Sequence, residues 1–130
     1  MRRVTICTIV AVSAVGVGGA VTHAGAAPDR AGATATTLKL KAAASGALRF
    51  NKSTLRAPAG SVTIKLKNPS SSGKPHAVEV EGKGIEKKSS TIGPGKGTSV
   101  SVRLKKGRYE FYCPVDGHKA AGMKGTLIVS

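Results

Sequence analysis

The sequence predicts an all-β domain, an antiparallel sandwich or barrel of short strands. Three observations support this prediction. Apolar residues alternate with polar ones in about seven segments, Gly and Pro separate these segments, and no helical period is sustained beyond the first residues. A chain of 130 residues is long enough for one domain and a tail. The core is expected to be small, because the sequence holds two Phe, two Tyr and no Trp.

The expected strands follow from alternation along the chain, since successive side chains of a strand point to opposite faces. Alternation begins at Leu38, and the clearest strand spans residues 61–67, with Val62, Ile64 and Leu66 on one face. Three further segments behave in the same way: residues 76–81, 98–105 and 126–130. Gly82 to Gly97 contains five Gly and one Pro with little periodicity, so we expect loops there.

The N-terminus is typical of a secretory signal peptide. Arg2 and Arg3 form a basic start, and a long apolar run without charge follows them. Ala24-Gly25-Ala26 then fits the small-x-small pattern of a cleavage site. The alternative is an uncleaved anchor, since the 18 apolar residues of Val4 to Val21 could just span a bilayer. Their Gly content disfavours stable insertion and therefore favours cleavage.

Cleavage at this site divides the chain into three parts. Residues 1–26 are the signal peptide, residues 27–37 are a flexible Ala/Thr/Gly linker, and residues 38–130 are the folded domain. We therefore expect an exported protein that is periplasmic, extracellular or at the cell surface. If the leader is not cleaved, the same linker would tether the domain to the membrane.

The expected mature chain is strongly basic. Without Arg2 and Arg3, 19 Lys and Arg residues face 6 Asp and Glu, a formal charge of +13. Such a surface attracts anionic partners, such as an acidic redox protein, a membrane surface or a cell-wall polyanion. Nucleic acid is not expected, because an exported protein does not meet it and because the sequence has no aromatic stacking platform interleaved with the basic residues.

The stretch from residue 109 to residue 123 carries the most informative chemistry. Cys113, His118 and Met123 follow one another at intervals of five residues. A thiolate, an imidazole and a weak thioether are donors of a trigonal blue-copper site with an axial Met. The required second His is available at His76, which shares its strand parity with inward-facing valines and should point into the core.

Other interpretations of these residues are weaker. Cys and Met are often simple core residues, and a buried His is often bonded to a carbonyl. Structural zinc rarely accepts Met, and a Cys–His nucleophile would need a third orienting group that is not evident. Cys113 would be the sole cysteine after leader removal, and an unpaired thiol in an oxidising compartment needs protection such as metal ligation. No second metal cluster or substrate-cleft motif points to an enzyme.

With these residues the chain resembles the cupredoxins, the small blue-copper proteins, over residues 50–130. Its Cys-x4-His-x4-Met spacing looks most like that of auracyanin and rusticyanin. The resemblance implies a Greek-key β-sandwich or barrel of about seven to eight strands. It also implies one copper ion, Cu(I) or Cu(II), held by His76, Cys113 and His118 in a plane with Met123 axial. In such proteins the loop His reaches an apolar surface patch that serves as electron port, here Pro114, Val115, His118, Ala120 and Ala121.

The function implied is one-electron transfer with a redox partner that docks over His118. Lys119 and Lys124 would then meet an acidic surface on that partner. A copper-delivery protein in metal homeostasis, with the same ligands and no redox turnover, is the alternative. One position departs from the family pattern: many members have Asn after the first His ligand, and this chain has Ala77. The side-chain tie between two loops is therefore lost, although the Ala77 amide can still approach the Cys sulfur.

Overall fold

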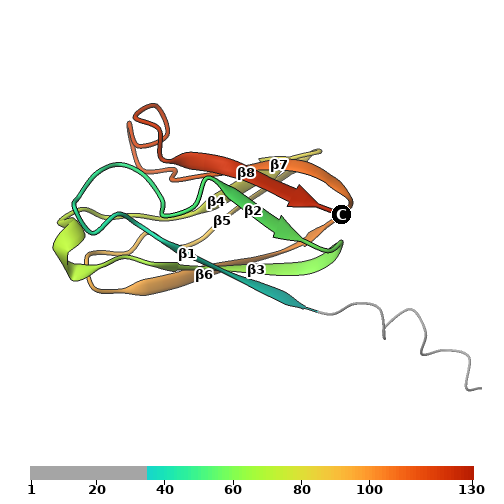
Figure 1. The fold of residues 1–130 in the computed structure, drawn as a ribbon, viewed down its shortest axis with the longest axis horizontal. Helices are drawn as coiled ribbons and strands as arrows, with labels where there is room; N and C mark the ends of the chain where they lie inside the picture. The colour runs from blue at the N-terminus through green and yellow to red at the C-terminus, as the bar shows by residue number, and fades with distance from the viewer. Residues whose placement is uncertain (1–34) are drawn as a thin grey trace, which may run out of the picture.

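The computed structural model describes residues 35–130, so the predicted leader and most of the predicted linker lie outside the described residues. The described part is a sandwich of two stacked sheets, with β1, β3 and β6 in one layer (Figure 1). The strands are β1 (Thr36–Lys41), β2 (Thr54–Ala57), β3 (Gly60–Lys67), β4 (Glu79–Gly82), β5 (Ile85–Lys88), β6 (Gly97–Leu104), β7 (Gly107–Tyr112) and β8 (Lys124–Val129). The predicted all-β class is confirmed, and a 3₁₀ turn at Ser70–Ser72 is the one helical element of residues 35–130.

The two sheets differ in size and in pairing. The smaller sheet has the order β1-β3-β6 and the larger one the order β2-β8-β7-β4-β5. Most neighbours are antiparallel, as the sequence predicts. However, β1 pairs with β3 and β2 pairs with β8 in parallel. Each parallel pair joins strands that are not linked by a hairpin, so local turn signals could not predict it.

The core lies between the inner faces of the two sheets. The alternating residues Val62, Ile64 and Leu66 of β3 are buried, as predicted, and Phe111 and Leu127 face them from the larger sheet. This burial of apolar surface is the main force that holds the two layers together.

Several strand boundaries differ from the prediction, and one strand was not predicted. Strand β1 begins at Thr36 rather than at Leu38. The segment from Gly82 to Gly97, expected to consist of loops, contains β5, which pairs with β4 through a two-residue turn. Both turn residues, Lys83 and Gly84, have positive φ (49° and 77°), as in a type I′ hairpin. The strand escaped detection because three of its four residues are exposed, which leaves no apolar alternation.

The topology brings the candidate metal ligands to one end of the sandwich, here named the ligand pole. Strands β4 and β7 are antiparallel, with Glu79 opposite Tyr112. His76 precedes β4 and Cys113 follows β7, so both residues lie at the same pole, as expected. Regular pairing of β4 begins only at Glu79, and His76 is instead held by an isolated bridge to Ile92. Within the described residues, no helix has the length and apolar character needed to cross a membrane.

Candidate metal centre

Three potential metal ligands converge at the ligand pole. The donor atoms of His76, Cys113 and His118 all lie within 4.8 Å of one another, and all three side chains are buried. The sulfur of Cys113 lies 3.4 Å from Nδ1 of His118 and 3.9 Å from Nδ1 of His76. The two imidazole rings are 5.2 Å apart and tilted by 55°. The spacing of the loop residues and the strand parity of His76 predicted this convergence, although His76 and Cys113 are far apart in the chain.

His76 is fixed through its backbone. Its amide donates to the Ile92 carbonyl at 3.0 Å, and the Ile92 amide donates back to the His76 carbonyl at 2.9 Å. The side chain is fully buried, with Nδ1 facing the Cys113 sulfur and Nε2 without a hydrogen-bond partner. Burial lowers the pKa of His76, and nearby His118 and Lys74 lower it further. The imidazole is therefore held neutral, the form that binds a metal.

Asn68 supports the two segments that hold His76, a role that was not predicted from the sequence. This fully buried side chain donates to the carbonyl of Lys74 at 2.8 Å and to that of Ile92 at 3.3 Å, and it accepts from the Ser72 hydroxyl. It thus links the segment before His76 to the segment that bridges His76. Ala77 cannot provide a side-chain tie, and Asn68 provides one from the end of β3. The sequence showed only an Asn-Pro pair closing a strand.

Cys113 lies directly after β7, at the start of the segment 113–123 that leads to β8 and is here named the ligand loop. Its amide donates to the Met123 carbonyl at 3.0 Å, and its side chain has no exposed surface. Burial raises the pKa of the thiol, while backbone hydrogen bonds from Ala77 and Val115 to the sulfur lower it. This effect on the thiol is consistent with the expected approach of the Ala77 amide to the sulfur. Two amides directed at sulfur would stabilise the thiolate that a metal requires.

His118 and Met123 complete the loop. The His118 amide donates to the Val115 carbonyl and the Met123 amide to the His118 carbonyl, each at 3.0 Å. His118 keeps 9% of its surface exposed, whereas the other two converging ligands and Met123 have none. Burial and Lys74 lower the pKa of His118, although Asp116 raises it. The side chain of Met123 is thus buried in a loop closed around His118, and its axial role stays a prediction.

The residues predicted to form an electron port surround His118 unevenly. Pro114 and Val115 are half-buried, and Ala120 and Ala121 are exposed. His118 is the least buried of the converging ligands, as an electron port would need. The patch itself remains a prediction.

The two predicted docking lysines differ in their surroundings. The Lys119 ammonium lies 3.1 Å from Oε1 of Glu110, 3.8 Å from Oε2 of Glu81 and 3.7 Å above the Tyr112 ring. Its charge is thus partly compensated within the protein. Lys124 is exposed, and no ion pair involves it within residues 35–130. Lys124 is therefore the better candidate for a partner's acidic surface.

The donor set fits a copper ion. The cluster combines one soft sulfur with two imidazoles and contains no carboxylate, which hard cations would prefer. The His76–Cys113–His118–Met123 arrangement is consistent with one copper ion. Its rigid, buried setting would limit the change in geometry between the two oxidation states.

Comparison with known proteins decides the family. The model of the cupredoxin-like domain matches residues 10–129. The chain belongs to the cupredoxin-like family. This cupredoxin is similar in structure to auracyanin B, with 25% identity and a TM-score of 0.65 over 73% of this chain and 88% of that one.

Two more auracyanins share the fold. The dithionite-reduced auracyanin of Roseiflexus castenholzii is 23% identical, with a TM-score of 0.64 over 76% of the cupredoxin and 99% of that chain. Auracyanin A, a blue copper protein from Chloroflexus aurantiacus, is 22% identical, with a TM-score of 0.62 over 75% of the cupredoxin and 100% of that chain. No curated protein matches the chain. The predicted resemblance to cupredoxins of the auracyanin kind is confirmed.

The first prediction concerns Asn68. Replacing Asn68 with Ala removes two hydrogen bonds that Asn68 donates in a buried site and the one that it accepts from the Ser72 hydroxyl. We expect the free energy of unfolding of the metal-free protein to fall by about 2–3 kcal/mol, measured by urea unfolding. Asn51→Ala is the matched control, because Asn51 is exposed and accepts one bond from the Lys41 amide, and should cost less than about 1 kcal/mol. Equal losses would show that Asn68 has no special role.

The second prediction concerns pH. The metal-free fold should be most stable between about pH 6.5 and pH 9, the ordinary pKa values of the His and Cys side chains. Below this window the two histidines bind protons more readily in the unfolded chain than in the folded one, because folding lowers the pKa values of His76 and His118. The free energy of unfolding should therefore fall as the pH falls. Above this window the Cys113 thiol loses its proton more readily in the unfolded chain than in the folded one, because folding raises the pKa of Cys113. The free energy of unfolding should therefore fall as the pH rises.

Urea midpoints between about pH 5 and pH 10 would measure this profile. In Cys113→Ser the loss of stability at the alkaline end should shrink while the acidic loss remains. An alkaline loss of the same size in Cys113→Ser would contradict the assignment to the thiol.

Proposed function

We propose that this protein is an exported type 1 copper protein that carries single electrons, with His76, Cys113, His118 and Met123 as copper ligands. The observation that carries the proposal is the convergence of one sulfur and two imidazole Nδ1 atoms within 4.8 Å, buried at one pole of a rigid sandwich. Auracyanin A, which has the same fold, is itself a blue copper protein. Copper in such a site would supply reversible one-electron exchange between Cu(I) and Cu(II).

Electron exchange requires a short path to the surface and little rearrangement. His118 offers the path, because it combines contact with the Cys113 sulfur and a remaining exposed edge. His76 and Asn68 support the second requirement, since their hydrogen bonds fix the loops that frame the site. A partner protein would dock over the patch around His118, and exposed Lys124 would face an acidic surface on it.

Export is proposed from the sequence of the leader alone. Its basic start, apolar run and small-x-small site fit a secretory signal peptide. An unpaired, buried Cys113 is compatible with an oxidising compartment when a metal occupies its thiolate.

The third prediction tests ligation. Adding Cu(II) to the wild-type protein should give one bound copper and intense thiolate-to-Cu(II) absorption in the visible range. Cys113→Ser should abolish the colour, since the charge-transfer donor is gone, and His76→Ala should disturb it strongly. Met123→Leu is the matched variant: a weak axial ligand should be dispensable for the colour, and its loss should raise the reduction potential. A colourless copper complex of the wild-type protein would refute the assignment.

The fourth prediction separates an electron carrier from a copper-delivery protein. A carrier should keep copper in both oxidation states and exchange electrons rapidly with an acidic redox protein, at a rate that falls as salt rises. Lys124→Glu should slow this transfer several-fold without changing the blue absorption. Lys83→Glu, which makes the same charge change in the β4–β5 turn away from the ligand pole, should have a smaller effect.

Stopped-flow mixing with an acidic electron acceptor would measure these rates. Loss of Cu(I) to an acceptor protein, together with slow electron exchange, would instead identify a copper-delivery protein.

A further inference from the structure

The two sheets of the domain carry different charge. Five acidic residues occur in residues 35–130, and all lie on the larger sheet or in the ligand loop: Glu79, Glu81, Glu86, Glu110 and Asp116. None of the three strands of the smaller sheet contains an acidic residue. The excess positive charge of the domain is therefore not spread evenly, because one layer has no carboxylate to compensate its lysines.

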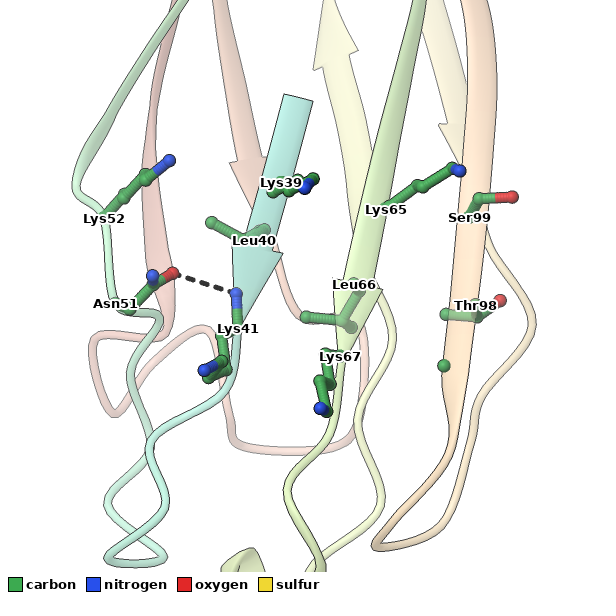
Figure 2. Close-up of a pocket in the computed structure, with 11 residues that line it drawn as sticks. Lys39, Leu40, Lys41, Asn51, Lys52, Lys65, Leu66, Lys67, Thr98 and Ser99 are labelled. Atoms are coloured by element: carbon green, nitrogen blue, oxygen red, sulfur yellow. Dashed lines mark hydrogen bonds between the residues drawn. The ribbon is translucent and has the colours of Figure 1, made fainter. Parts of the chain in front are cut away.

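The outer face of the smaller sheet is basic along its length. Lys39 of β1 lies opposite Lys65 of β3, and Lys41 lies opposite Lys67. All four are exposed, and the side chains project from the two neighbouring strands in Figure 2. Arg103 of β6 is exposed on the same face, further from the ligand pole. We name these five residues the basic face.

This arrangement has a cost in the isolated protein. Neighbouring strands are about 4.8 Å apart, and like charges directly opposite one another destabilise a sheet. No salt bridge involves any residue of the basic face within the described part of the chain. A bound anion would remove this repulsion, so the face is suited to an anionic partner.

A groove of about 500 Å³ lies on the basic face, at the end of the smaller sheet nearest the ligand pole. Its rim includes all four strand lysines and, from the neighbouring loop, Lys52. Ser99 adds a hydroxyl group on the side of β6, opposite Lys65, and Figure 2 shows it beside β3. No carboxylate of residues 35–130 lines the groove. Ammonium and hydroxyl groups are donors that suit phosphate oxygens.

We infer that the basic face binds the surface of an anionic phospholipid membrane. The positive groups extend over three strands and an adjoining loop, so they match a plane of headgroups better than a single linear polymer. The face has no aromatic side chain, which indicates adsorption by charge rather than insertion among the lipids. This inference does not depend on the proposed copper chemistry.

The basic face and the ligand pole can act together. The face runs along the strands, whereas the candidate ligands lie beyond the strand ends. Lys41 and Lys67 are the members of the face nearest to the ligand pole, since Asn68 directly follows Lys67. A domain lying with this face on a membrane would leave the patch around His118 open at its edge, free to meet a membrane-bound partner laterally.

Vesicle binding tests the inference. The full chain is mixed with vesicles of phosphatidylcholine containing about one-third phosphatidylglycerol, or of phosphatidylcholine alone, and the bound fraction is measured by co-sedimentation. We expect binding to the anionic vesicles that weakens as salt rises. A variant with Lys39, Lys41, Lys65 and Lys67 all changed to Gln should bind several hundredfold more weakly, since each Lys near such a surface adds about a fivefold gain.

The matched control changes Lys83, Lys87, Lys88 and Lys106 to Gln. These four residues are exposed, lie outside the basic face and give the same loss of net charge. All three proteins carry residues 1–34, so any lipid contact of that segment is common to them. Thermal unfolding checks the fold, and the variant of the basic face should be at least as stable as wild type because it loses like-charge repulsion.

Two outcomes would overturn the inference. Equal losses in both variants would mean that net charge, and not this face, governs the binding. Binding to soluble polyphosphate without binding to anionic vesicles would mean that the face serves a linear polyanion and not a membrane.

Discussion

The hydrogen bond from the Cys113 amide to the Met123 carbonyl governs the geometry of the candidate metal centre. It extends the β7–β8 ladder one step beyond its last regular pair, Tyr112 and Lys124. The ligand loop is therefore closed at its base by two central strands of the larger sheet. The two strands pack closely where Phe111 pairs with Gly125, because a Cβ at Gly125 would overlap the Phe111 ring. Stability of the core and placement of three candidate ligands thus depend on the same pair of strands.

Much of this could be predicted from local patterns. Alternation located the buried residues of β3 because a half-buried strand must alternate, and donor spacing located the metal site because few other folds need those three residues at that interval. Strand β5 and the pairing of Lys119 with Glu110 could not be predicted. The first has no apolar pattern, and the second depends on which strands become neighbours. The role of Asn68 could not be predicted either, since it depends on two separate loops that supply its hydrogen-bond acceptors.

Burial sets the charge of the site before any metal enters. It keeps the two imidazoles neutral by lowering the pKa values of His76 and His118, and it keeps the thiol protonated by raising the pKa of Cys113. At neutral pH the empty cluster therefore carries no net charge, and occupation by copper would release a single proton, from Cys113. The neutral pocket contrasts with the basic face on the outer side of the smaller sheet.

The parallel pairing of β2 with β8 has a consequence for the order of assembly. Strand β2 lies in the first half of the domain, and its neighbour in the sheet is the last strand of the chain. A chain that emerges N-terminus first, from a ribosome or through a membrane, cannot complete the larger sheet until its final residues are free. Cys113, His118 and Met123 lie just before that final strand. The last structural step of folding would therefore also be the one that creates the binding pocket, so the nascent chain would present no assembled copper site on its way out.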